Sequence, residues 1–413
     1  MGQRMKHTDI GDIPADWKLQ TFEETFRVLS NNTLSRENLN NKGGAVRNIH
    51  YGDILTKFPE VLNCNEEDIP YLNDLSLITA NTQLLQDGDV VIADTAEDDT
   101  GGKTIEVQNL GNGKLVAGLH TIPCRVKKGD FAPGWLGYYM NSYIYHDQII
   151  PFITGIKVSS ISKTAIAETI ILVPPVEEQE RIVETLSQLD SLIKQETSVS
   201  EKLNNVKSSC LSKIFPKDDE KKPEMRFPEF TDTWEQRKLG AVAKYRNGKA
   251  HENEIEDDGE YIVVNSKFVS TNGEVRKFSN VQNEPLYENE IAFVLSDVPN
   301  GRAIARTFLI DKSGKYTLNQ RIAGITPHED TDPYYLYIKM NRNAYFLKFD
   351  DGNKQTNLSI KDVLNYEDMY PSYKEQQKIG IYFRNLDNLI TLHQRKCDKY
   401  KSIKAGLIRK LFP

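Results

Sequence analysis

The sequence predicts an α+β protein in which two similar globular domains are joined by a pair of long antiparallel coiled-coil helices. Three observations lead to this fold class. The chain has 413 residues, which is too long for one ordinary hydrophobic core. One amphipathic motif with helical spacing occurs twice. Elsewhere, short β-branched and aromatic runs alternate with Gly and Asn turns, which is typical of strands in a mixed fold.

Composition narrows the class of protein. Hydrophobic residues make up 38% of the chain and charged residues 27%, which is typical of a folded chain and not of a disordered one. The polar start and the lack of a long apolar run predict a cytoplasmic protein with no membrane partner. Four widely separated cysteines predict neither a zinc site nor a disulfide framework. The net charge of −7 disfavours a nonspecific nucleic-acid binder, although a specific one needs only a local basic face.

The first element is a globular domain over residues 1–173. Its strand-like run VVIAD, residues 90–94, is followed by GGKT at 101–104, which resembles the end of a phosphate-binding loop. Glu97 occupies the place where such a loop needs its first glycine, and an acidic side chain would repel a phosphate. The sequence therefore predicts no nucleotide site in this domain. No metal site is expected either, because the histidines and cysteines do not cluster at ligand spacing.

The second element is a long helix over residues 174–216, which opens with PPVEEQERIVETLSQLD. Its apolar residues recur at alternating intervals of four and three residues, which is close to the period of a coiled coil. It ends at Phe215-Pro216, where proline cannot continue a helix. A helix of roughly 57 Å needs a partner for its apolar stripe.

A charged linker, residues 217–226, and a second globular domain, residues 227–370, follow. The linker contains the residue types of a nuclease catalytic motif, namely Asp218, Glu220 and Lys222. A catalytic metal site needs rigidly placed carboxylates, which a solvated linker does not provide. In the second domain DPYY, residues 332–335, resembles a methyltransferase motif, yet its second proline and a glycine-rich cofactor loop are missing. The sequence therefore predicts a binding protein and not a catalyst.

The second domain weakly repeats the first. Gly155-Ile156-Lys157 aligns with Gly352-Asn353-Lys354 at the offset that holds for the helices, and Gly102-Lys103 resembles Gly301-Arg302 with a small gap. The domains have diverged much more than the helices. Two related domains with different surfaces are therefore expected.

The last element is a second long helix over residues 371–413. When Gln179 is aligned with Gln376, the two helical motifs match without a gap to the last residue. We expect the helices to form one antiparallel pair with Leu189 facing Leu386, because each helix must carry the chain between two domains. The alternative is two helices that each pack only on their own domain. The predicted seam contains Ile182, Leu186, Leu189, Ile193, Leu203, Ile379, Phe383, Leu386, Ile390 and Tyr400.

Duplex DNA presents equivalent positions once per helical turn, or about every 34 Å. Two similar domains held apart by helices can therefore read two half-sites on one duplex. Because the domains have diverged, the half-sites need not match, and the target would be asymmetric. Arg and Lys read guanine, whereas Asn and Gln read adenine. The candidate DNA-reading residues are Arg36, Lys42, Arg47, Asn48, Lys103, Lys157 and Ser159 in the first domain, and Asn247, Lys249, Asn265, Lys267, Arg302, Lys354, Gln355 and Asn357 in the second.

The doubled motif, PPVEEQERI and PSYKEQQKI, resembles the specificity subunit of type I restriction–modification systems, as does MRFPEFTDTWEQRKLG at the start of the second domain. The resemblance covers nearly the whole chain. It implies two target-recognition domains, each reading one half of a bipartite DNA target in a host-defence system. It also implies that the helices set the gap and dock two modification subunits, with no catalysis and no cofactor in this chain.

The resemblance further implies that the modification subunits methylate adenine with S-adenosylmethionine, and that two restriction subunits translocate and cut DNA with ATP and Mg²⁺. One alternative from another class stays open at this point. An adaptor could join two protein partners through the helices without binding DNA.

Overall fold

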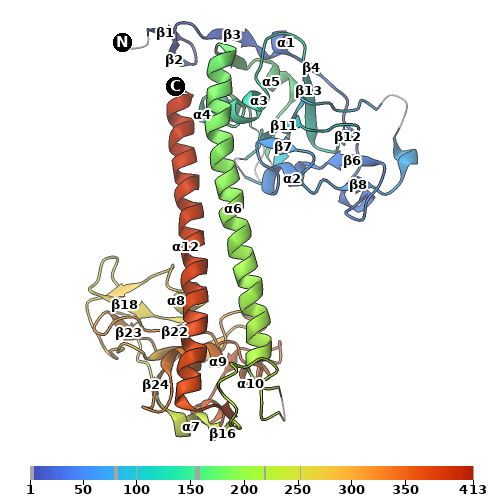
Figure 1. Ribbon diagram of the computed structural model, residues 1–413. Helices are drawn as coiled ribbons and strands as arrows, with labels where there is room; N and C mark the ends of the chain where they lie inside the picture. The colour runs from blue at the N-terminus through green and yellow to red at the C-terminus, as the bar shows by residue number, and fades with distance from the viewer. Residues whose placement is uncertain are drawn as a thin grey trace. The chain divides into compact units, whose positions relative to one another are not determined.

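The computed structural model describes residues 4–78, 82–98, 100–153, 159–217, 220–251 and 253–412 (Figure 1). The chain divides into two compact units. Unit 1 comprises Met1–Glu196 and Lys396–Pro413, and unit 2 comprises Thr197–Arg395. Each unit thus contains one globular domain together with a part of each long helix. The unit boundaries lie within the helices and not at their first residues.

Unit 1 is built on two sheets with one hydrophobic core on each face of the larger one. Strand β9 (Val90–Ala93) is buried along its whole length, which explains why its sequence, VVIA, is continuously apolar. The five-stranded sheet has the order β4 (Phe26–Val28), β13 (Thr121–Val126), β9 (Val90–Ala93), β11 (Thr104–Gln108) and β7 (Val61–Asn63). The four-stranded sheet has the order β12 (Lys114–Ala117), β6 (Val46–Ile49), β8 (Tyr71–Leu72) and β5 (Leu39–Asn40).

Unit 2 repeats this topology with one strand fewer in each of the two sheets, so the predicted repeat of the domains is confirmed at the level of the fold. Its parallel pair β18–β23 corresponds to the parallel pair β6–β12 of unit 1. The four-stranded sheet has the order β17 (Ala243–Asn247), β24 (Ile322–Pro327), β20 (Ile291–Val294) and β22 (Thr307–Leu309). The three-stranded sheet has the order β19 (Phe278–Ser279), β18 (Tyr261–Val264) and β23 (Tyr316–Leu318).

Short elements complete the two units, and apart from β1, β2 and the 3-10 turns of unit 1 they repeat in the same order. In unit 1 they are β1 (Met5–Thr8), β2 (Gly11–Pro14), β3 (Lys18–Thr21), α1 (Phe22–Thr25), α2 (Tyr51–Thr56), β10 (Thr95–Ala96), α3 (Trp135–Tyr139), α4 (Tyr143–Ile149), β14 (Ser159–Ser160), α5 (Lys163–Ala167), β15 (Ile170–Val173) and 3-10 turns at Arg36–Asn38, Leu75–Leu77 and Ile150–Phe152. In unit 2 they are β16 (Glu235–Lys238), α7 (Leu239–Val242), α8 (Ser266–Ser270), β21 (Ser296–Asp297), α9 (Pro333–Met340), α10 (Ala344–Leu347), β25 (Thr356–Asn357), α11 (Ile360–Leu364) and β26 (Glu367–Tyr370).

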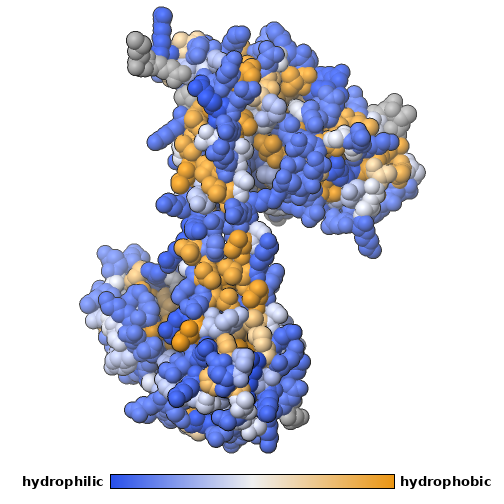
Figure 2. All heavy atoms as spheres, in the orientation of Figure 1, coloured by the Kyte–Doolittle hydropathy of each residue, from blue (hydrophilic) through white to orange (hydrophobic). Residues whose placement is uncertain are grey.

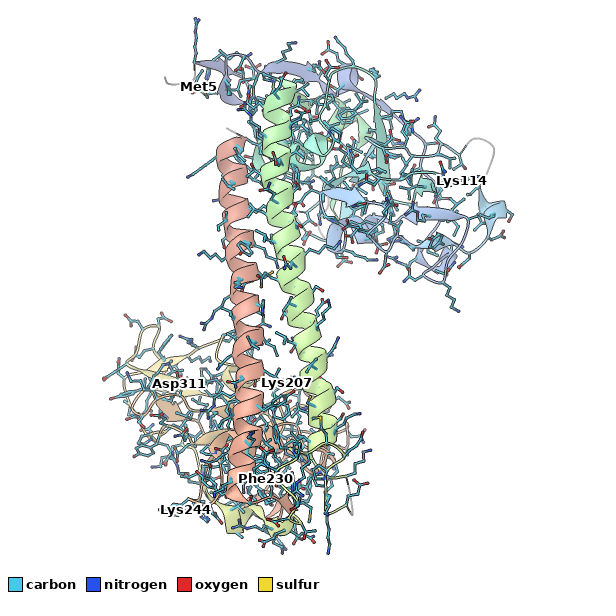
Figure 3. The ribbon with its side chains drawn as sticks, in the orientation of Figure 1. Met5, Lys114, Lys207, Phe230, Lys244 and Asp311 are labelled. Carbon is cyan, nitrogen blue, oxygen red and sulfur yellow. The ribbon has the colours of Figure 1, made fainter. Side chains whose placement is uncertain are left out.

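The two long helices are α6 (Val176–Ile214) and α12 (Tyr373–Leu411), each of 39 residues. In unit 1 the first half of α6 lies beside the last part of α12, because Lys404 Nζ is 2.6 Å from Asp190 Oδ1. In unit 2 the second half of α6 lies beside the first part of α12, where Lys207 Nζ, labelled in Figure 3, is 2.5 Å from Asp387 Oδ1. The pairing is therefore antiparallel within each unit, as predicted.

The burial of the predicted seam residues follows this pairing. In unit 1, Leu186 is fully buried in a core against which Leu407 and Leu411 pack. The expectation that Leu189 faces Leu386 is wrong. Antiparallel pairing places the start of one helix against the end of the other, so these equivalent residues lie in different units. Of the other seam positions, Ile182, Ile379, Phe383, Leu386 and Ile390 are buried, and Leu189, Ile193, Leu203 and Tyr400 are partly exposed.

Candidate nucleic-acid interface

A buried glutamine at the start of each long helix attaches that helix to its domain. Gln179 Oε1 accepts a hydrogen bond from Ala132 N at 2.9 Å, and its Nε2 donates to Asp130 O at 3.1 Å and to Pro174 O at 2.8 Å. The side chain is fully buried. All three partners are backbone atoms, so this attachment does not depend on which side chains the domain carries.

Gln376 makes the same three contacts in unit 2. Its Oε1 accepts from Asp332 N at 3.0 Å, and its Nε2 donates to Asp330 O at 3.3 Å and to Pro371 O at 3.0 Å. The repeated Glu-Gln pair of the helical motifs is thus explained by a structural role of its glutamine. Each glutamine fixes how a domain is oriented on its helix, and it therefore positions whatever surface that domain offers.

Replacement of Gln376 by alanine should weaken unit 2 measurably. The change leaves the buried Pro371 carbonyl and the part-buried Asp332 N–H without their amide partner, and a buried unsatisfied group costs about 1–3 kcal/mol. The neighbouring Gln377 is exposed, so Gln377→Ala should stay within about 0.5 kcal/mol of the parent. Denaturant unfolding of both variants measures the difference. Equal midpoints for the two variants would show that the amide contacts contribute nothing.

A second repeated cluster joins the helices to each other and to a domain. In unit 1, Asp190 accepts hydrogen bonds from Lys404 Nζ at 2.6 Å and from the Tyr138 hydroxyl at 2.7 Å. Lys404 also pairs with Glu60 at 2.9 Å. Burial raises the pKa of Asp190. Burial by itself would lower the pKa of Lys404, but the two carboxylates outweigh it and raise that pKa.

A similar cluster occurs in unit 2. Asp387 and Lys207 occupy the positions equivalent to Asp190 and Lys404, whereas Tyr334 lies one helical turn before the residue equivalent to Tyr138. Asp387 accepts from Lys207 Nζ at 2.5 Å and from the Tyr334 hydroxyl at 2.6 Å. A buried charge is stable only where its partner is correctly placed. These clusters therefore favour one register of the helix pair over others shifted by a turn.

The polar loops of unit 2 meet at one edge of its sheets, which we call the polar edge of unit 2 and define as residues 247–249, 265–267, 296–302, 319–321 and 354–357. Backbone hydrogen bonds connect these loops. Lys249 N donates to Leu318 O at 3.0 Å, and Asn319 N donates to Val264 O at 3.1 Å. Leu295 N donates to Arg321 O at 3.1 Å, and Leu358 N donates to Leu295 O at 2.9 Å. Loops from five separate segments thus form one continuous surface.

All the second-domain candidates lie on this edge, and the first four occupy the strand ends around β17 and β18. Asn247 is exposed and accepts a hydrogen bond from the Tyr245 hydroxyl at 2.6 Å. Lys249 is exposed and pairs with Glu284 at 3.0 Å. Asn265 caps α8 by accepting from Phe268 N at 2.9 Å, which occupies its side-chain oxygen. Lys267 is exposed in the first turn of α8.

The other four second-domain candidates flank the small sheet β21–β25. Gln355 Nε2 donates to Ser296 Oγ at 2.8 Å, which ties the two segments together. Arg302, Lys354 and Asn357 are exposed. The ungapped repeat around Gly352 is reflected in the fold, because β25 and β14 form the same two-stranded pairing in their units.

Unit 1 has a corresponding polar edge, defined here as residues 30–32, 48–51, 94–98, 118–120 and 159–160. Four backbone hydrogen bonds hold it in the same way as in unit 2. They are Asn32 N to Ala117 O at 2.8 Å, Gly118 N to Ile49 O at 2.8 Å, Asp94 N to His120 O at 3.1 Å and Ile161 N to Asp94 O at 2.8 Å.

The first-domain candidates are more scattered. Arg36 forms a bidentate pair with Asp53 at 2.6 and 2.9 Å, and Arg47 donates to Cys64 O at 2.5 Å. Lys42 is exposed. Asn48 is fully buried and accepts from Asn32 Nδ2 at 2.6 Å, so in this conformation its amide supports the edge from inside.

The remaining first-domain candidates lie around β11 and β14. Lys103 Nζ donates inward to Leu55 O at 3.1 Å, and burial lowers its pKa. Lys157 lies outside the described residues, and for Ser159 only the backbone, in β14, is described.

The strand register corrects one predicted correspondence. Ala93 N donates to Lys103 O at 2.9 Å, and in unit 2 the same bond joins Val294 N to Arg306 O at 2.9 Å. Lys103 therefore corresponds to Arg306 and not to Arg302. The loop after β21 is longer than the loop after β10, and this insertion produced the misleading match of Gly-Lys with Gly-Arg.

Sequence reasoning missed the turns that precede β13 and β24. Asn319, Gln320 and Arg321 form one such turn, and the turn before β13 ends at His120. The run NQR between two strand-like segments was a usable signal, since it offers amide and guanidinium groups in a short connection. The run was overlooked because no first-domain run resembles it.

Across the described ranges, no group of three or more His, Cys, Asp or Glu side chains could hold a metal ion. Among the helices of the same ranges, none is long and apolar enough to cross a membrane.

Comparisons with known proteins agree with the repeated fold. A family model described as "Type I restriction modification DNA specificity domain" matches residues 14–205 and 231–401. The "Putative type I restriction enzyme MjaX specificity subunit" of Methanocaldococcus jannaschii is 22% identical over 434 residues, covering 99% of this chain and 96% of the relative. The MjaVIII specificity subunit of the same organism is 24% identical over 289 residues, covering 62% of this chain and 64% of the relative.

Solved structures show the same fold. The S subunit of a type I restriction–modification system from M. genitalium superposes with a TM-score of 0.62 at 14% identity, covering 100% of this chain and 99% of that one. A second solved chain comes from a structural study of complex assembly and conformational transition in the type I R-M system. It superposes with a TM-score of 0.55 at 12% identity, covering 97% of this chain and 98% of that one. At these identities the likeness concerns the fold alone.

Proposed function

This chain belongs to the type I restriction–modification DNA specificity family, and from that premise we propose that its two polar edges each read one half of a bipartite DNA target. The observation that supports this best is the repeated edge itself. The same backbone hydrogen bonds hold both edges, while the side chains on them differ. A common scaffold with different side chains is what two unlike half-sites require. The adaptor alternative finds no support in the family match.

We also propose that the paired helices set the gap between the half-sites and dock two copies of a modification subunit. Leu192 of α6 and Leu389 of α12 are exposed at equivalent positions, as are Val206 and Ile403. Each unit thus exposes one leucine and one β-branched residue at these equivalent positions, and unit 2 also exposes Ile381 and Leu392. An apolar pair that is repeated in both units fits two copies of one partner.

Figure 2 shows apolar residues over the pair of helices in unit 2. The exposed apolar residues there include Val206, Ile381, Leu389 and Leu392. In the proposed complex the modification subunits would carry S-adenosylmethionine and methylate adenine, and two restriction subunits would use ATP and Mg²⁺ to translocate and cut DNA. This chain would supply recognition without catalysis, in the cytoplasm, where the DNA to be read lies.

A map of methylated adenine in host DNA, with and without this gene, tests the proposal. Loss of one split motif, two short unlike halves with a fixed gap, is expected when the gene is deleted. The control restores the gene and should restore the motif. An unchanged map in cells that contain the modification subunit would contradict the proposed function.

A further inference from the structure

The residue immediately before β13 and the residue immediately before β24 occupy the same place in the two units. His120 O accepts a hydrogen bond from Asp94 N at 3.1 Å, and Arg321 O accepts one from Leu295 N at 3.1 Å. The strands that follow pair in the same register, since Thr121 faces Ala93 on β9 just as Ile322 faces Val294 on β20. This equivalence follows from backbone geometry alone, because the two sequences do not match here.

The backbone that carries Arg321 is tightly held. Ile322 N donates to Asn319 O at 3.0 Å, and Gln320 N donates to Asn319 Oδ1 at 2.8 Å. Gly248 packs against this turn so closely that a Cβ would lie 2.0 Å from Asn319 O. Only glycine therefore fits at position 248. Arg321 itself is exposed, so the turn presents a guanidinium on a fixed backbone at the polar edge of unit 2.

The equivalent residue in unit 1 has different chemistry. The His120 ring lies 3.2 Å from Thr95 Oγ1 and 3.5 Å from Asp94 Oδ1. Its ring centroid is 5.3 Å from that of Tyr51 in an edge-on contact. An imidazole offers one or two N–H groups on opposite sides of a ring. A guanidinium offers a planar fork of parallel donors. The two edges therefore present different donor patterns at one shared position.

We propose that this shared position determines base specificity in each unit, and that Arg321 reads a guanine in the major groove of the second half-site. The inference deepens the proposed function and rests on it. The guanidinium fork matches guanine O6 and N7, two acceptors that other bases do not present together. His120 cannot form that bidentate pair, so the first half-site is read differently at the equivalent place.

The test uses the full chain assembled with its modification subunits and duplex oligonucleotides that carry the mapped target. Methylation rates are measured for every single base change in both halves, for the parent, Arg321→Ala and Arg321→Lys. Lys312→Ala is the matched control. Lys312 is an exposed cation of the same unit, next to Asp311 (labelled in Figure 3), in the turn after β22 at the opposite end of the strands.

We expect Arg321→Ala to reduce discrimination at one G·C pair of one half-site by about 5- to 150-fold. Discrimination in the other half-site and the salt dependence of binding should stay unchanged. Lys312→Ala should leave base discrimination in both half-sites and the salt dependence unchanged. Arg321→Lys should retain part of the preference, because lysine keeps the charge but not the fork. Thermal melting of each variant confirms that the exposed substitution leaves the fold intact.

Three other outcomes can be distinguished. Equal weakening on all sequences with a shallower salt dependence would mean that Arg321 contacts phosphate, and would overturn the inference. Unchanged discrimination would also overturn it while leaving the proposed function in place. A parent complex that methylates no bipartite motif would refute the proposed function instead.

Discussion

Exchange of residues 1–173 for the first domain of another specificity subunit should replace one half of the target and leave the other half unchanged. The structure gives a physical reason for this modularity. Gln179 holds the domain through Asp130 O, Ala132 N and Pro174 O, which are backbone atoms that any sequence supplies. The second domain and its attachment through Gln376 lie in unit 2 and are not altered. The methylated-adenine map of cells with the chimaera measures the result.

The reciprocal exchange of residues 227–370 is the control, and it should change the other half. The donor domain should carry an aromatic residue at the position of Trp135, because Phe412 packs against that ring. A chimaera that changes both halves of the motif would refute independent reading by the two domains. A chimaera that assembles fully and changes neither half would refute reading by residues 1–173.

Truncation of Phe412 to alanine should destabilise unit 1 by about 3–5 kcal/mol, the usual cost of removing a fully buried phenylalanine side chain. Phe412 follows α12 directly and has no exposed surface. Its ring centroid lies 5.2 Å from that of Trp135 and 6.1 Å from that of Tyr139. These contacts join the last turn of α12 to the core of the first domain. Denaturant unfolding followed by tryptophan fluorescence measures the loss, since Trp17 and Trp135 both belong to unit 1.

Phe215→Ala is the matched control, because Phe215 ends α6 as Phe412 ends α12. Phe215 is partly exposed and lies 5.8 Å from Tyr335 between ring centroids. Its removal should therefore cost less than removal of Phe412. A Trp234→Phe background leaves only the tryptophans of unit 1 and separates the two transitions. Equal unfolding curves for Phe412→Ala and the parent would show that the end of α12 is not held in the core.

The helices were predictable because their information is local, and their antiparallel direction was predictable because each must carry the chain between two domains. Apolar residues at helical spacing and prolines at the boundaries define α6 and α12 in any context. The buried Leu186 and Phe383 were identified in this way. The repeat of the domains was only partly visible, since strands that keep their pairing tolerate changes in nearly every side chain. VVIAD and IAFVLSD were recognisable because both sequences continue through a fully buried strand.

The candidate interface was predictable in outline and not in detail. Choosing polar loops between strands placed every second-domain candidate on one edge. The same reasoning selected Asn48 and Lys103, whose side chains point inward, because residue type does not report the direction of a side chain in a loop. It passed over Arg321, whose equivalence to His120 appears only in the strand register.

The sequence alone determined that two related domains alternate with two matched helices, and it identified the family through their repeated motif. Periodicity and repetition are properties of the amino-acid sequence, and they can be recognised without a structure. The tertiary structure decided which residues meet. It placed Asp190 beside Lys404 and Asp387 beside Lys207, where the sequence had suggested that Leu189 faces Leu386. It also brought Arg321 to the polar edge of unit 2. Such contacts join residues far apart in the chain, so their partners are fixed by the packing of strands and helices and not by any local pattern.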